Sequence, residues 1–153
     1  MSKAITMTVE GIDDLKAALK KLDKSLQGPA ARAAMKSGGS ELLLYIQENI
    51  VDQDLIDTGN LHNEWTVKPE SDRVVVIGTN VKYAPMHEYG GVVKAKNGKW
   101  LTFQTRDGSW HRVASVHIPA RPFVRPAVDE HKGDVSQAVG ESLKASIERH
   151  TRT

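Results

Sequence analysis

The sequence contains no cysteine among its 153 residues. This absence excludes disulfides, thiolate metal ligands and cysteine nucleophiles, and it is typical of a protein made in a reducing cytosol. The chain must therefore be held together by packing alone. A chain of this length buries roughly two thirds of its unfolded surface, which is enough for one core.

The sequence also lacks a long hydrophobic run and a large excess of charge of either sign. No stretch approaches the length of a transmembrane helix. We expect no signal peptide, because residues 1–9 hold one lysine and no long apolar run. The formal net charge is +2, with 26% charged and 39% hydrophobic residues. This composition is that of a soluble globular protein, and the charge is too small to argue for nucleic-acid binding.

Complete catalytic and metal-binding motifs are missing as well. His87 and Glu88 lack the second histidine of a zincin helix, and no glycine pair is followed by the residues of a phosphate loop. His111 and His117 would share one face of a strand, but zinc needs three or four converging ligands. Residues 57–59 match the aspartic-protease tripeptide, which would require a homodimer and an all-strand fold, whereas helices are expected around it. We therefore expect no enzyme, no cofactor and no metal site.

The first third of the chain predicts one strand and two helices. Alternating apolar residues predict a short strand over residues 5–9. Leucines and isoleucine at three- and four-residue steps predict a helix over residues 12–26, which Gly28 ends. A second helix is expected from residue 29 to residue 50. Its glycine pair at 38–39 predicts either a kink or another backbone packed closely against the helix.

The middle of the chain predicts strands. Trp65 and Val67 begin one strand, residues 70–72 form a turn, and residues 74–77 return as a second strand. The four consecutive apolar residues of this second strand suggest that it is covered on both faces.

A basic and aromatic segment follows at residues 92–117. Two strong hairpin-turn dipeptides lie ten residues apart, at Asn97-Gly98 and Asp107-Gly108. They predict a three-stranded meander. The segment mixes basic and aromatic side chains: Lys94, Lys96, Lys99, Arg106 and Arg112 with Trp100, Phe103 and Trp110. Because it is too polar to bury fully, we expect a protruding β-hairpin arm.

The C-terminal part predicts a stiff connector and a last helix. Three prolines within residues 118–126 fix the backbone in an extended form, and Pro126 is expected to open a helix over about residues 126–149. Its buried side is marked by apolar residues, namely Val128, Val135, Val139, Leu143 and Ile147. We expect a single α+β domain over residues 1–153, with two or three helices packed on a mainly antiparallel β-sheet.

Three segments, taken in order, resemble the small tail-completion and minor tail proteins of long-tailed phages. They are residues 57–61, 83–91 and 118–127. The family is the head–tail joining family of the lambdoid siphophages with its Mu-type virion-morphogenesis relatives. The resemblance covers nearly the whole chain, except that many short relatives lack the segment at 92–117. The motif residues are Asp57, Thr58, Gly59, Tyr83, Pro85, Glu88, Tyr89, Gly90, Arg121, Pro122, Phe123 and Arg125.

The resemblance implies a structural virion assembly protein and no catalysis. Such a protein would be assembled in the bacterial cytoplasm into the tail or neck, where it completes the tail or joins it to the head. Its expected partners are its own copies, in a ring that is expected to be a hexamer, and tail tube, terminator or head connector proteins. Its motif residues either form interfaces or only hold the local fold, and Arg121 and Arg125 could pair with carboxylates in either place. The alternative is a nucleic-acid-binding module that uses the basic hairpin at 92–117.

Overall fold

A computed structural model describes the backbone of residues 5–10 and 24–151, and the side chains of residues 28–149. The chain divides into two compact units. The first unit comprises the residues up to Lys82 and those from Phe123 onward, and the second unit is Tyr83–Pro122. The expectation of a single domain over the whole chain stays a prediction.

The sheet of the first unit has three antiparallel strands in the order β1-β3-β2. The strands are β1 (Ile5–Glu10), β2 (Trp65–Pro69) and β3 (Val74–Thr79). All three lie where the sequence predicted strands, and the turn between β2 and β3 is confirmed. The predicted α+β class with mainly antiparallel pairing is therefore confirmed.

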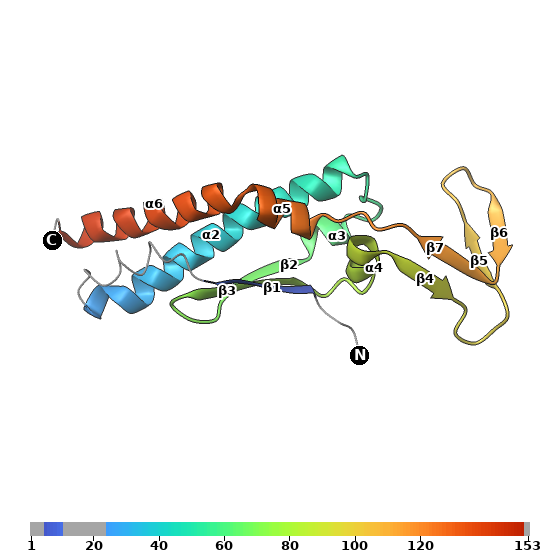
Figure 1. Cartoon of the computed structure of the whole chain (residues 1–153), viewed down its shortest axis with the longest axis horizontal. Coiled ribbons are helices and arrows are strands. Elements are labelled where there is room, and N and C mark those ends of the chain that lie inside the picture. Colours follow the sequence, from blue (N-terminus) through green and yellow to red (C-terminus); the bar gives the residue numbers. More distant parts are fainter. Residues whose placement is uncertain (1–4, 11–23, 152–153) are drawn as a thin grey trace. The chain divides into compact units, whose positions relative to one another are not determined.

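The central strand β3 differs from its prediction in how it is covered. Val75 and Ile77 are buried, whereas Val74 and Val76 are half-buried. Among the described helices, α2 is the one that packs on the sheet, and it covers the side of β3 on which Val75 and Ile77 lie (Figure 1). The apolar run alone could not distinguish this arrangement from a strand buried on both faces.

The helix on the sheet is α2 (Lys24–Asp52), and its start was predicted wrongly. The sequence indicated an end at Gly28 and a new start at residue 29, but α2 runs through both residues. Pro29 lies in the second turn, where its fixed φ suits the helix and only one backbone hydrogen bond is lost. The predicted helix over residues 12–26 lies, up to residue 23, outside the described residues.

The C-terminal part forms two helices instead of one. They are α5 (Val124–Glu130) and α6 (Lys132–Thr151), separated at His131, whose φ is −112° and ψ is 23°. The predicted start at Pro126 is therefore two residues late. Pro126 occupies the first turn of α5, where backbone N–H groups have no intrahelical partner and a proline costs little.

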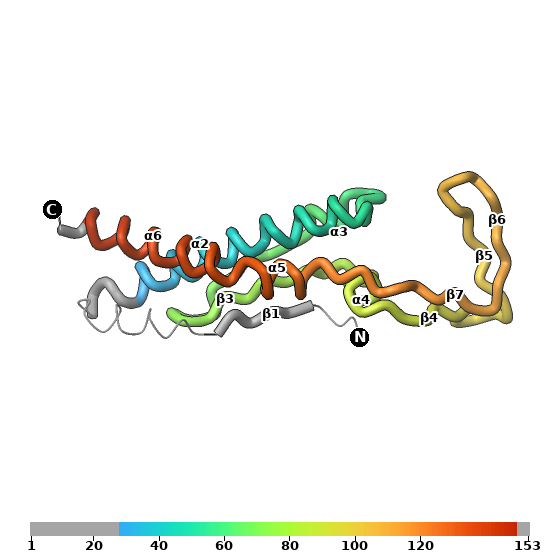
Figure 2. The backbone as a smooth tube through the Cα atoms, turned by 45° about the horizontal axis from the view of Figure 1, so that its top comes forward, coloured from blue at the N-terminus to red at the C-terminus, as the bar shows by residue number. Residues whose placement is uncertain are grey.

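The glycine pair shows why α2 can lie between the sheet and α6 (Figures 1 and 2). A Cβ on Gly38 would stand 2.5 Å from Val139 Cγ2 of α6. A Cβ on Gly39 would stand 2.8 Å from a methyl carbon of Val67 and of Val75. Close packing against the pair is confirmed, but mainly by side chains: the backbone atom near the pair is Val135 O of α6, 3.3 Å from a Cβ on Gly38. The predicted kink is absent, because α2 is continuous through the pair.

The core of the first unit lies where α2 meets α6 and the sheet. It includes Ala34, Met35, Val75, Val139 and Leu143. The predicted buried side of the last helix is confirmed at Val135, Val139 and Leu143, whereas Val128 and Ile147 are half-buried. In the part of the chain that the structure describes, no helix combines the length and hydropathy needed to cross a membrane.

The second unit contains α4 (Ala84–Tyr89) and two antiparallel strand pairs, one nested inside the other. The outer pair is β4 (Gly91–Lys94) with β7 (Ser115–Ile118). The inner pair is β5 (Leu101–Gln104) with β6 (Trp110–Val113). The predicted three-stranded meander is therefore wrong.

The two predicted turns of this segment have different outcomes. Asp107 and Gly108 do form the turn between β5 and β6, with Gly108 at φ +86°. Asn97 and Gly98 form no hairpin, because β4 pairs with β7 and not with β5. A turn dipeptide reports local backbone preference, whereas the choice of strand partner depends on residues far along the chain.

Candidate functional site

The second and third motif segments meet in the second unit. Gly91 pairs with Ile118 at the start of the outer strand pair. The backbone N–H of Arg121 donates to the carbonyl oxygen of His87 over 2.7 Å. Residues 83–91 and 118–121 therefore form one corner, and we call it the α4 corner.

Gly90 makes this corner possible. Its φ is +69°, a conformation that side chains with a Cβ rarely adopt. A Cβ there would also stand 2.7 Å from the backbone nitrogen of Ala120. The motif glycine is thus required both for its conformation and for the close approach of the connector.

The helix of the α4 corner holds the other motif residues of this segment. Pro85 lies in the first turn of α4, where its missing N–H is tolerated. The ring of Tyr83 meets the ring of His87 edge to face at 5.8 Å between centroids. Glu88 is buried at 5% exposure, whereas Tyr89 is 65% exposed. Tyr89 is therefore the residue of α4 that is best placed to contact another protein.

His87 is the titratable residue of this corner with a shifted pKa. Burial lowers its pKa, and the positive charge of Arg121 lowers it further. Its Nδ1 is buried and has no hydrogen-bond partner among the described residues. His87 is therefore neutral at physiological pH.

The first motif segment forms the turn before α3 (Asn60–Asn63). Gly59 has φ +83°, and its carbonyl oxygen accepts hydrogen bonds from the backbone N–H groups of His62 and Asn63. Asp57 and Thr58 are exposed in this turn. The helices expected on both sides of the Asp-Thr-Gly tripeptide are present, so its surroundings differ from those of a protease turn.

Phe123 of the connector is an anchor of the first unit. Its side chain is fully buried, and the ring of Trp65 meets it edge to face at 6.2 Å. The side chain of Asn49 donates to the Phe123 carbonyl oxygen over 3.0 Å. Trp65 in turn donates its indole N–H to the carbonyl oxygen of Leu61 over 2.6 Å. Phe123 and the first motif segment are therefore linked through Trp65, which the sequence did not single out.

The other connector residues do not share this burial. Arg121 and Pro122 are half-buried, and Arg125 is exposed on α5. Of the candidate residues, the structure thus joins the 83–90 segment to Arg121, and the 57–59 turn to Phe123. The first of these groups belongs to the second unit, and the other to the first unit.

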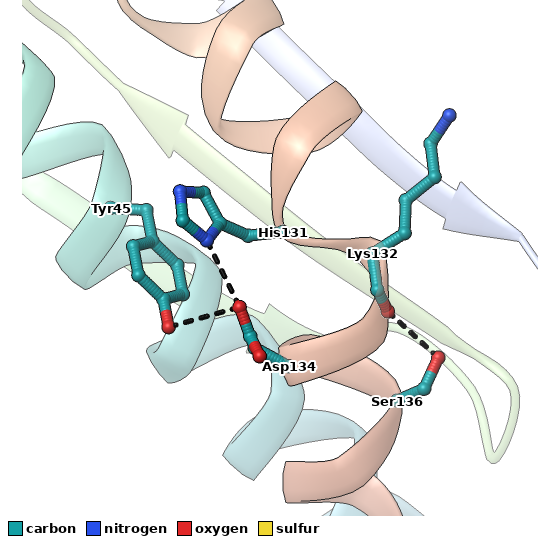
Figure 3. A network of polar contacts seen from close by, with 5 residues as sticks. All are labelled: Tyr45, His131, Lys132, Asp134 and Ser136. Carbon is teal, nitrogen blue, oxygen red and sulfur yellow. Dashed lines mark hydrogen bonds and ion pairs between the residues drawn. The ribbon is translucent and has the colours of Figure 1, made fainter.

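A polar network that the sequence did not predict joins α2 to the start of α6 (Figure 3). The rings of Tyr45 and His131 stack at 3.5 Å between centroids. One carboxylate oxygen of Asp134 accepts from the Tyr45 hydroxyl over 3.3 Å and lies 3.0 Å from His131 Nδ1. The break between α5 and α6 at His131 accompanies this network, in which the imidazole lies against Tyr45 of α2. The only sequence pattern that hints at it is a histidine three residues before an aspartate.

The network also shifts the pKa of two of its members. The hydrogen bond from His131 holds the pKa of Asp134 below its usual value. Partial burial, followed by the nearby charge of Asp134, raises the pKa of Tyr45. Asp134 is therefore a carboxylate, and Tyr45 a neutral donor, across the physiological range.

A groove lies beside this network, between α2 and α6. Its cavity volume is about 190 Å³. It is lined by three acidic residues together with three neutral ones: Glu41, Asp134 and Glu141 with Tyr45, Gln137 and Ala138. We call it the acidic groove. Where the structure describes side chains, no three histidine, aspartate or glutamate residues are placed to hold a metal ion.

The inner strand pair of the second unit exposes large aromatic side chains. Trp110 is 70% exposed and Trp100 is 50% exposed. The guanidinium of Arg112 lies over Trp100 at 5.6 Å, and the rings of Phe103 and His111 stack at 5.7 Å. Apolar and basic groups are therefore interleaved on this hairpin, as the sequence predicted.

One of the comparisons with known proteins gives a match, and it is to a family. Neither the curated proteins nor the solved structures include a match to this chain. Residues 13–90, just over half of the chain, match the model of a family described as "Bacteriophage HK97-gp10, putative tail-component". The match spans α2, the sheet strands β2 and β3, and most of the α4 corner. The chain therefore belongs to the HK97-gp10-like family of bacteriophage tail components, and its role is that of a structural part of the virion.

Proposed function

We propose that this protein completes the phage tail or joins it to the head, as a ring component of the neck or of the head-proximal end of the tail. The family gives a structural tail role. The observation that carries the finer proposal is the α4 corner. Its two segments resemble those of head–tail joining proteins, and they fold together through the Arg121–His87 hydrogen bond and the Gly90 contact.

The exposed side chains support a role in assembly. Tyr89, Trp100 and Trp110 are each at least half exposed. Large exposed aromatic residues are enriched at protein–protein interfaces, where they supply area at low entropic cost. The partners in this proposal are further copies of the chain, in a hexameric ring, and tail tube, terminator or head connector proteins. The proposal contains no catalytic step.

The experiment is an early stop codon in this gene of a phage that carries it, followed by negative-stain electron microscopy of the lysate. Filled heads lying apart from tails, or tails of abnormal length, are expected. A complementing copy with Gly90→Ala should fail to rescue, because the added Cβ meets the Ala120 backbone. A copy with Gly140→Ala should rescue, because no atom of the described residues lies within 4 Å of the added Cβ. Intact infectious particles without the protein would overturn the proposal.

The alternative of nucleic-acid binding has a weaker basis in the structure. The basic hairpin carries exposed aromatic rings, as single-strand binding proteins do. However, the formal net charge of the chain is only +2, which offers a nucleic acid little electrostatic attraction. A nucleic-acid binder would be retained on a DNA column and released steeply with salt. We expect no such retention.

A further inference from the structure

We propose that the β5–β6 hairpin of one copy docks in the acidic groove between α2 and α6 of a second copy. The inference rests on the proposed ring function, and it names the two different surfaces that meet at each contact of the ring. A ring with cyclic symmetry needs such a pair, because each subunit contacts its neighbours head to tail.

The first argument is the separation of charge along the chain. Residues 92–117 hold five of the 21 basic residues and one of the 19 acidic residues, so this segment carries a charge of +4. The whole chain carries +2, so the remaining residues carry −2. A chain with a basic segment and an acidic remainder attracts other copies of itself in one orientation.

The second argument is the exposure of the hairpin. The inner pair β5–β6 has only two strands, and such a hairpin is marginally stable in water by itself. Side chains alternate between its faces, so Trp110 and Arg112 share one face while Phe103 and His111 share the other. All four residues are exposed in the single chain. A hairpin with aromatic and basic groups exposed on both faces is suited to burial against a second surface.

The third argument is the chemistry of the groove. Glu41, Asp134 and Glu141 line a volume of about 190 Å³. One water needs about 10–15 Å³ of such space, so the groove can admit side chains. Ala138 supplies an apolar part of its lining. The carboxylates fit Arg112 and Lys99, and the lining between them fits an exposed tryptophan.

A nucleic acid is the competing occupant of the hairpin, but it would leave the acidic groove without a role. A second copy of the chain uses both surfaces. The observations therefore favour self-association.

The test is a charge exchange in the full-length protein, followed by sedimentation velocity over a range of concentrations. In the first variant, Lys99→Glu and Arg112→Glu change the charge of residues 99–113, which contain the hairpin, from +2 to −2. In the second variant, Glu41→Lys and Glu141→Lys make the groove basic. Each variant alone should self-associate at least roughly tenfold more weakly than the wild type. A mixture of the two should associate again, because each hairpin then meets a groove of opposite charge.

A matched control and a second measurement accompany this test. Glu70→Lys changes an exposed charge in the β2–β3 turn, away from the groove, and should leave association unchanged. The chain has no cysteine, so Ser109→Cys near the hairpin turn and Ala138→Cys in the groove introduce the only thiols. Mixing these two single variants under oxidation should give a disulfide-linked dimer.

Two outcomes would overturn the inference. One is a wild-type protein that stays monomeric at every concentration at low salt. The other is a charge exchange that fails, either because neither variant weakens association or because the mixture does not recover it. Both outcomes would leave the tail role standing, because the stop-codon phage tests that role separately. DNA retention that disappears in the acidic-hairpin variant would instead assign the hairpin to nucleic acid.

Discussion

Replacing Gly38 of α2 or Gly140 of α6 with alanine should change the stability of the protein in opposite directions. The two positions differ in what surrounds the Cα. Gly38 faces Val139 across the helix interface, whereas a Cβ on Gly140 would meet nothing within 4 Å in the part of the chain that the structure describes. We predict that Gly38→Ala lowers the free energy of unfolding by about 1–3 kcal/mol through overpacking. Gly140→Ala should raise it by about 0.5–1 kcal/mol, because alanine favours the helix.

Urea denaturation of the two glycine variants measures the free energy of unfolding directly, at one buried position of α2 and one exposed position of α6. The Gly140 variant is the control for helix propensity alone. Equal effects of the two substitutions would show that α2 and α6 do not pack as closely as described.

A second prediction at this scale concerns His87 and pH. Its folded pKa lies below the unfolded value because burial, and then Arg121, disfavour the charged ring. The unfolded chain therefore binds the proton more readily than the folded one. Stability should fall as the pH drops below about 6.5, the ordinary histidine value, and level off below the folded pKa.

His87→Gln removes this titration and should flatten the pH dependence of stability over the same interval. The measurement is denaturation at a series of pH values, together with the NMR titration of the His87 ring. A folded His87 that titrates at or above the ordinary value would contradict the prediction.

At the scale of elements, a substitution of Pro29 tests whether this proline interrupts helix α2. Pro29 is exposed and leaves one backbone hydrogen bond unmade in the second turn. We predict that Pro29→Ala stabilises the protein by about 1 kcal/mol, below the roughly 3 kcal/mol of a mid-helix proline. Circular dichroism during thermal unfolding measures the helix content and the stability together.

The control for Pro29→Ala is Ala33→Gly, at an exposed position one turn further along α2. This substitution should destabilise the protein by about 1 kcal/mol if the helix propensity of the residue determines the effect at that position. No gain from Pro29→Ala would place the true start of α2 after residue 29, as the sequence alone suggested.

The strands that the sequence predicted best are those whose signal is local. The alternation at residues 5–9 was sufficient to predict β1, and the turn before β3 was sufficient to predict the β2–β3 pair. Both signals depend on a few neighbouring residues. The nesting of β5–β6 within β4–β7 was missed, because partner choice depends on pairing across 20 or so residues. The break at His131 was missed because no local pattern marks it, and the ring that His131 stacks on, that of Tyr45, lies on another helix.

The candidate residues also divide into those that a local pattern marks and those whose role depends on distant parts of the chain. The sequence identified Gly59, Gly90 and Phe123, and each has a clear structural role in a turn, a close approach or the core. Trp65 and Asp134 were missed, because a single tryptophan or aspartate carries no spacing pattern. Their roles arise only where separate elements meet.

At the scale of the whole molecule, the buried residues are distributed very unevenly. Among the residues whose side chains are described, Ala84 and Glu88 are the only buried ones in the second unit. All the others, including the cluster around Val139, belong to the first unit. The stability of the first unit should therefore depend little on the hairpin segment.

The last prediction concerns a variant in which Asn-Gly replaces residues 95–114. Lys94 lies opposite Ser115, so a two-residue turn can close the outer pair without changing its register. The melting temperature of the first unit should stay within about 2 °C of the wild type, because no core residue is removed. Self-association and the rescue of a stop-codon phage should both be lost, because the basic hairpin is gone. If the shortened protein is stable and still rescues the phage, the hairpin has no part in assembly. If the shortened protein unfolds, the first unit needs the hairpin for its own stability.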